Sequence, residues 1–236
     1  MEKPDFSGLK AIYLNCTLKK SPRTSNTKGL SDVSMSIMKK EGVKVDYIRL
    51  VDHVVPHGMG KDMRKYEEKE DDWPQLFKRI QDADILVVAT PIWLGEISSV
   101  AKKLIERLDA MSAEVNNKGQ YIYYGKTGGC IVTGNEDGIK NCAKYILFSL
   151  QHIGYSIPPQ AGTGWIGKAG PGPSYLDEET GAKDHEFTNK SITFMTYNLM
   201  HLASYLKEKD GYPAYGNAEE KWSEGERWKF EKPEYD

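Results

Sequence analysis

Hydroxyl and amide side chains are concentrated in residues 15–27, which read Asn-Cys-Thr-Leu-Lys-Lys-Ser-Pro-Arg-Thr-Ser-Asn-Thr. Apolar residues with helical spacing follow this stretch, and an apolar run that is typical of a strand precedes it. A helix beginning here directs unpaired N–H groups and the positive end of its dipole at these side chains. The stretch is therefore either an anion site, suited to phosphate, or a Ser/Thr/Asn helix cap after a turn.

The elements that position this stretch form a regular alternation of strands and helices. Strands are predicted at residues 10–15, 43–50, 84–90, 128–133 and 155–157. Helices are predicted at residues 25–41, 73–81, 98–113, 139–154 and 188–208. The third strand has five apolar residues in a row, as expected of a central strand in a parallel sheet. The alternation predicts an α/β fold: a doubly wound, five-stranded parallel sheet of order 2-1-3-4-5 with helices on both faces.

Ligands of such a sheet bind at the carboxyl ends of its strands, where the strand order reverses. The loops after the first, third and fourth strands are residues 15–27, 91–95 and 134–138. We expect these three loops to line one crevice, with Trp93 beside the first loop.

Length and charge narrow the class of protein. The chain has 236 residues and a formal net charge of -2, which suits one large α/β domain and gives no general attraction to nucleic acid or anionic membranes. No apolar run approaches the ~18 residues of a membrane span, and the first five residues lack an apolar signal region. Cys16, Cys130 and Cys142 are too scattered for a disulfide framework or a metal site. We expect a cytoplasmic protein with reduced thiols and no metal.

Two segments lie outside this alternation. Residues 160–189 are rich in glycine and proline and are predicted to be loop, in which residues 160–175, with Trp165, form either a lid or a flexible surface loop. Residues 211–236 alternate aromatic and charged residues. We expect residues 1–210 to form one domain and residues 211–236 to be a tail that packs on this domain or on a partner subunit.

The sequence matches neither the P-loop motif of triphosphate-binding proteins nor the glycine fingerprint of dinucleotide-binding folds. Residues 119–127 end in Gly-Lys-Thr, but Gln120 occupies the position of the first glycine of a triphosphate P-loop, and the segment precedes its strand. The fingerprint Gly-x-Gly-x-x-Gly of dinucleotide-binding folds is absent after the first strand.

Three motifs in order resemble the NADPH-dependent FMN reductases of the flavodoxin-like superfamily, over residues 9–155. They are residues 15–27 before a helix, Thr-Pro-Ile-Trp-Leu-Gly-Glu-Ile-Ser-Ser at 90–99, and Ile-Val-Thr-Gly-Asn-Glu-Asp-Gly at 131–138. The resemblance implies non-covalent FMN as cofactor and NAD(P)H as co-substrate.

The resemblance also implies which residues bind the flavin. The phosphate is expected to be held by Thr17, Ser25, Asn26 and Thr27. The ring is expected to lie along Pro91, Ile92, Trp93, Leu94 and Gly95. Its pyrimidine edge is expected to meet Thr133, Gly134, Asn135, Asp137 and Gly138. Hydride enters at flavin N5 and no acid or base is required, so we name no catalytic residue.

The chain departs from the family pattern in the first loop, because residues 17–20 intervene before Ser21-Pro-Arg23. Either Thr17 or Ser21 is then the first hydroxyl ligand. Lys19, Lys20 and Arg23 are phosphate contacts, contacts to the phosphate of a nicotinamide cofactor, or ordinary surface. Residues 51–71 contain no cysteine, so no iron–sulfur cluster of the kind found in related flavoproteins is expected.

Two functions of different classes follow. The first is an FMN-dependent NAD(P)H oxidoreductase that reduces a small acceptor, namely a quinone, a nitro or azo compound, or free flavin. The alternative is a flavodoxin-like electron carrier that docks to protein partners. Near-neutral charge favours the enzyme, because carriers that dock electrostatically have a strong surface charge of one sign. A homodimer or homotetramer is expected from the aromatic tail and the resemblance.

Overall fold

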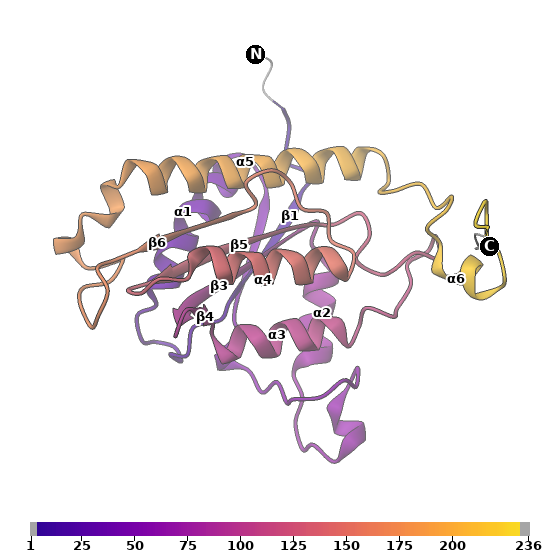
Figure 1. Ribbon diagram of the computed structural model, residues 1–236, viewed down its shortest axis with the longest axis horizontal. Helices are drawn as coiled ribbons and strands as arrows, with labels where there is room; N and C mark the ends of the chain where they lie inside the picture. Colours follow the sequence, from indigo (N-terminus) through magenta and orange to yellow (C-terminus); the bar gives the residue numbers. More distant parts are fainter. Residues whose placement is uncertain (1–3, 232–236) are drawn as a thin grey trace, which may run out of the picture.

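A parallel sheet between two layers of helices organises the chain in the computed structural model, which describes residues 4–231 (Figure 1). The strands run in the order β2-β1-β3-β5-β6, and all neighbours on this path are parallel. Their bounds are β1 Lys10–Asn15, β2 Lys44–Arg49, β3 Ile85–Trp93, β5 Thr127–Gly134 and β6 Gly162–Ile166. The short β4, Glu96–Ile97, pairs antiparallel with the end of β3. The predicted flavodoxin-like class is confirmed, while the sheet differs from the predicted one by an unpredicted sixth strand, β4.

The helices divide between the two faces of the sheet. One face is covered by α1 (Asn26–Lys40) and α5 (Glu186–Glu208), and the other by α2 (Trp73–Asp82), α3 (Ser99–Asp109) and α4 (Ile139–His152) (Figure 1). A short α6, Glu219–Ser223, lies in the tail. Short 3₁₀-helices occur at Leu50–Asp52, Met63–Tyr66, Glu178–Thr180 and Ala182–Asp184. None of the helices among the described residues is long and apolar enough to cross a membrane.

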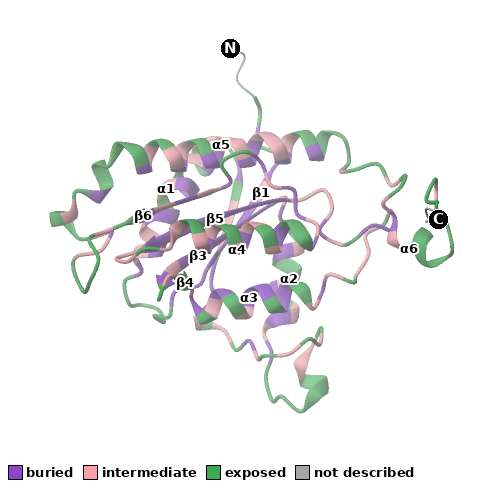
Figure 2. Ribbon diagram, viewed as in Figure 1, coloured by how far each residue is buried: buried purple, intermediate pink, exposed green. Residues whose placement is uncertain are grey.

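Alternate strand residues supply the cores of the two faces. In β1, Ile12 and Leu14 pack against the α2–α4 layer, while Ala11 and Tyr13 pack against α1 and α5. Residues 85–90 of β3 are all buried, as expected of a central strand covered on both faces. Figure 2 shows this burial concentrated on the strands, with exposed residues on the outer faces of the helices.

The prediction of the fifth strand is wrong. Residues 155–157 contribute only an isolated bridge between Thr127 and Ser156, and the strand itself is β6, inside the segment predicted to be loop. The glycines that suggested a loop permit close packing of the sheet here. A Cβ atom on Gly164 would lie 2.3 Å from the carbonyl oxygen of Val132. Trp165, predicted on a lid or surface loop, is therefore a strand residue, and only 7% of its surface is exposed.

The tail begins against the body of the protein and then leaves it. Gln120 Nε2 donates to Asn217 Oδ1 at 2.9 Å and to the carbonyl of Pro213 at 3.2 Å. Trp222 of α6 packs on Trp228 and Phe230, which lie beyond the helix, with ring centroids about 6 Å apart. Tyr235, the last aromatic residue of the predicted tail, lies outside the described residues, as do residues 1–3 and the rest of 232–236.

Candidate functional site

A cavity of about 640 Å³ lies at the carboxyl ends of the parallel strands, in the range typical of small-molecule sites. All three predicted loops line it. The predicted site residues in its wall are Thr17, Asn26, Thr27, Pro91, Ile92, Trp93, Thr133, Gly134 and Asn135. The remaining five, Ser25, Leu94, Gly95, Asp137 and Gly138, lie behind or beside the wall.

The start of α1 is both a helix cap and a candidate anion site, the two interpretations that the sequence left open for the first loop. Ser25 is the helix N-cap, since its hydroxyl accepts from the backbone N–H of Lys28 at 3.1 Å and also from Asn15 Nδ2. Asn26 and Thr27 open the helix, so their backbone N–H groups have no acceptor within it. Thr27 Oγ1 lies 2.7 Å from Thr133 Oγ1, which joins the first and third loops. The cap holds the helix end, and the helix end offers its N–H groups to an anion.

The two candidate hydroxyls of the first loop have different surroundings. Ser21 donates its hydroxyl to Asp52 Oδ2 at 2.6 Å, and its backbone N–H to Asp52 Oδ1 at 2.9 Å. Thr17 lines the cavity and Ser21 does not. Nη1 of Arg49, which is largely buried, donates to the carbonyl of Arg23 at 2.8 Å. The far half of the loop is thus fixed to the end of β2 and points away from the cavity.

The second loop forms the cavity rim. Trp93 is 52% exposed there, while Leu94 is 92% exposed and does not line the cavity. Leu94 and Gly95 both have left-handed backbones, with φ of 51° and 76°. Their N–H groups donate to the two carboxylate oxygens of Glu136, at 3.1 Å and 3.0 Å. Glu136 lines the cavity, as expected of the loop 134–138. Its bonds to the second loop were not predicted, since a bond between residues 42 positions apart leaves no local pattern in the sequence.

The third loop packs against the second. A Cβ atom on Gly138 would lie 2.7 Å from the carbonyl oxygen of Gly95, so the two glycines fix the distance between the loops. Asp137 Oδ1 accepts from the N–H of Gly138 at 3.1 Å. Asp137 and Gly138 therefore shape the site from outside the cavity wall.

Part of the segment that the sequence left open as a lid or a surface loop closes the cavity on one side. We call residues 167–176 the strap. Asn135 Nδ2 donates to the carbonyl of Pro173 at 2.6 Å, and Asn135 Oδ1 accepts from Ser174 Oγ at 3.0 Å. Asn26 Oδ1 accepts from the N–H of Leu176 at 2.9 Å. The side chains of Asn26 and Asn135 therefore anchor the strap as well as lining the cavity.

Two aromatic residues complete the wall. Trp165 of β6 and Tyr175 of the strap meet edge to face, with ring centroids 5.8 Å apart. Burial raises the pKa of Tyr175, so this side chain is a neutral phenol near pH 7. The wall also contains residues that the sequence placed in these segments without naming them as flavin ligands: Leu18, Lys19, Glu136, Trp165, Gly170, Pro171, Ser174 and Tyr175.

The cavity suits a phosphorylated flavin. Its first loop offers the helix N–H groups and the Thr17 hydroxyl to a phosphate, and its other walls offer Trp93, Trp165 and Tyr175 to an aromatic ring. Among residues 4–231, no group of three or more His, Cys, Asp or Glu residues is placed to hold a metal ion.

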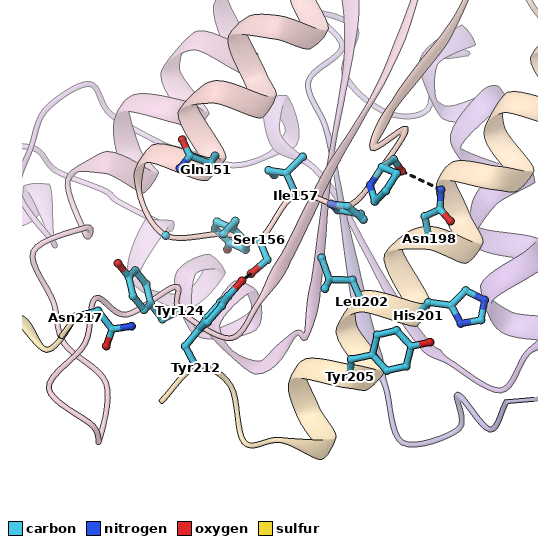
Figure 3. Close-up of a pocket in the computed structure, with 14 residues that line it drawn as sticks. Tyr124, Gln151, Ser156, Ile157, Asn198, His201, Leu202, Tyr205, Tyr212 and Asn217 are labelled. Atoms are coloured by element: carbon cyan, nitrogen blue, oxygen red, sulfur yellow. Dashed lines mark hydrogen bonds between the residues drawn. The ribbon is translucent and has the colours of Figure 1, made fainter. Parts of the chain in front are cut away.

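A larger cavity of about 830 Å³ lies at the opposite, amino-terminal edge of the sheet (Figure 3). Tyr124, Tyr212 and Ser156 form one wall, and Asn198, His201 and Tyr205 of α5 form the other. No Lys, Arg, Asp or Glu of residues 4–231 lines it. Ligands of parallel sheets bind at the carboxyl ends of the strands, so we assign the smaller cavity as the candidate site.

Fold and cavity together define a flavodoxin-like flavoprotein. The sequence profile of the NADPH-dependent FMN reductases matches residues 9–166, and the chain belongs to this family. Membership of this family makes FMN the cofactor of this chain.

The chain is 40% identical over 206 residues to the 8-demethyl-8-aminoriboflavin-5'-phosphate synthase of Streptomyces davaonensis, covering 85% of this chain and 79% of that one. The crystal structure of RosB with bound 8-demethyl-8-formylriboflavin-5'-phosphate superposes with a TM-score of 0.82 at 36% identity. It covers 97% of this chain and 92% of that chain.

A third relative has a name that does not refer to flavins. The chain is 55% identical over 204 residues to a protein of Mycobacterium bovis named divalent metal cation transporter MntH, covering 86% of this chain. The chain spans only 30% of the length of that relative.

Proposed function

We propose that this protein is a cytoplasmic NAD(P)H-dependent oxidoreductase whose bound FMN reduces a small acceptor such as a quinone, a nitro or azo compound, or free flavin. The observation that carries the proposal is the cavity itself, in which a helix N-terminus and an aromatic wall lie at one sheet edge. The phosphate is held at the start of α1 and by Thr17, and the ring lies between residues 91–95 and 133–135.

The chain's own residues bind and orient the flavin, while the flavin supplies the redox chemistry. Positioning of the donor and the ring is the protein's main contribution to such a transfer. At the rim Trp93 is half exposed to solvent, and a nicotinamide and then an acceptor approach the flavin from this side. Lys19 in the cavity wall offers a positive charge to a phosphate of either ligand.

The test is anaerobic mixing of FMN-loaded protein with NADPH and, separately, with NADH. Rapid loss of the oxidised flavin absorbance, followed by its return on addition of a quinone, is the expected result. If neither donor reduces the flavin, the proposed enzyme function is excluded, and an electron carrier that receives its electrons from a protein is favoured. If the protein takes up no FMN, both functions are excluded.

A second candidate is an enzyme that modifies the flavin itself. The observation in its favour is that the likeness to RosB extends over the strap and tail, beyond residue 166 where the family match ends. RosB holds a flavin phosphate whose 8-methyl group is replaced by formyl. Such chemistry needs an oxidant such as dioxygen, and an amine donor if an amino group is to follow.

Mass spectrometry separates the two candidates. The FMN-loaded protein is incubated with dioxygen and an amino acid, and its flavin is then extracted. An unchanged FMN mass supports the reductase, whereas a formyl or amino derivative supports the flavin-modifying enzyme.

A further inference from the structure

The turn at the cavity rim holds a carboxylate where an external anion would otherwise bind. Successive backbone N–H groups in a turn form a concavity that attracts anions. Here the N–H groups of Leu94 and Gly95 point to one acceptor, the Glu136 carboxylate, which takes one bond on each oxygen. The anion at this position thus comes from the chain itself.

The backbone of the turn requires such a partner. Leucine at φ 51° is in a region that L-residues rarely occupy, and the conformation persists only where its surroundings enforce it. The exposed Leu94 side chain offers little packing to enforce it. The two charge-assisted bonds from Glu136 and the contact between Gly95 and Gly138 supply the restraint.

Glu136 also belongs to the cavity wall. It lines the same space as Trp93, Thr133 and Gly134, and it links the loop after β5 to the loop after β3. A group that binds in the cavity therefore lies near the Glu136 side chain, whose bonds occupy two N–H donors at the rim.

We propose that Glu136 is a positioning residue that fixes the rim turn and lowers the reduction potential of the bound flavin. This inference rests on the proposed function. Hydride transfer from NAD(P)H moves two electrons and one proton to the ring and leaves NAD(P)⁺, so the ring gains one negative charge. A carboxylate in the cavity wall repels that charge, and the two N–H groups it occupies cannot stabilise it. The protein then binds oxidised FMN more tightly than reduced FMN.

The test compares Glu136→Gln with the wild-type protein by anaerobic titration against a reference dye, and the affinity for oxidised FMN is measured separately. Glutamine keeps the shape and one acceptor oxygen but removes the charge. The affinity ratio of reduced to oxidised FMN is expected to rise about tenfold, which is about 30 mV toward positive potential for a two-electron couple.

Two further variants assign the cause. Glu96→Gln removes the same charge from the neighbouring β4, where Oε1 of Glu96 accepts from Asn141 at 2.7 Å outside the cavity wall, and it is expected to leave the potential unchanged. Glu136→Asp keeps the charge and is expected to stay near the wild-type potential. It also provides a folded variant if Glu136→Gln is unstable.

The outcomes are distinct. FMN binding with a wild-type potential in Glu136→Gln, or an equal shift in Glu96→Gln, overturns the role of Glu136 and leaves the proposed function standing. A wild-type protein that takes up no FMN overturns the proposed function and this inference with it.

Discussion

The hydroxyl groups of the first loop have different partners in the structure, although they are chemically alike and the sequence does not distinguish them. Ser25 caps α1, Ser21 is bonded to Asp52, and Thr27 meets Thr133 across two loops. Thr17 remains, in the cavity wall, with a hydroxyl that accepts one long bond of 3.4 Å from the Lys19 N–H. Of the two alternatives that the sequence leaves open for the first phosphate ligand, these contacts favour Thr17.

Replacement of Thr17 by valine keeps the volume of the side chain and removes its hydroxyl. A hydrogen bond to a charged group contributes about 1.5–3 kcal/mol, so we expect FMN affinity to fall at least about tenfold. Ser21→Ala is the matched control and is expected to change the affinity less than about twofold. Fluorescence quenching of FMN measures both, and a larger loss in Ser21→Ala would reverse the assignment.

Among the elements, the strap shows how a loop becomes part of a site through side chains from elsewhere. Asn135 holds it with both its amide nitrogen and its amide oxygen, and the N–H of Gly170 donates to the Asn135 carbonyl at 3.0 Å. Asn135→Ala removes the side-chain bonds only. We expect flavin to dissociate about tenfold faster and the strap to be cleaved sooner by protease. Asn189→Ala is the control, because its amide donates to the carbonyl of Lys183, outside the strap in the 3₁₀ turn Ala182–Asp184. Unchanged dissociation in Asn135→Ala would show that the strap does not retain flavin.

The strand β6 demonstrates where sequence patterns are insufficient. A run with Gly162, Gly164 and Gly167 is typical of a loop, yet in the sheet a small residue is needed where backbones approach closely. Gly162 and Gly164 lie in β6, and Gly164 lies against the Val132 carbonyl of β5. The composition of β6 therefore reflects its packing against β5, which no local periodicity records.

Gly164→Ala tests this interpretation. The added methyl group would meet backbone that cannot rotate away, so β6 is displaced from β5 and the free energy of unfolding falls by about 1–3 kcal/mol. Urea denaturation should show a lower midpoint with an unchanged slope. Gly172→Ala, with no atom within 4 Å of the added methyl group, is expected to unfold like the wild type. Equal stability of both variants would contradict the packing argument.

At the scale of the whole molecule, features that depend on residues close together in the sequence were predicted well, and features that depend on distant residues were not. The buried run before Thr90 and the helix after Ser25 are local patterns, and both elements lie within a few residues of their predicted bounds. From the parallel topology alone, three loops that are distant in the sequence could be predicted to line one cavity, and their side-chain contacts were not needed for this. Glu136 and the strap depend on bonds across 42 and 38 residues, between loops without periodicity, and only the folded chain reveals them.

The tail bears on the assembly of the molecule. Trp222 stacks on Trp228 within the tail, 39% of its surface remains exposed, and 61% of Phe230 is exposed. Clustered exposed aromatic residues are typical of surfaces that bind another protein chain. We therefore expect sedimentation equilibrium to give the mass of a homodimer or homotetramer, and a Trp222→Ser/Trp228→Ser variant to dissociate while retaining its FMN. A monomeric wild type would contradict the expectation, whereas an oligomer unaffected by the substitutions would place the interface on another surface.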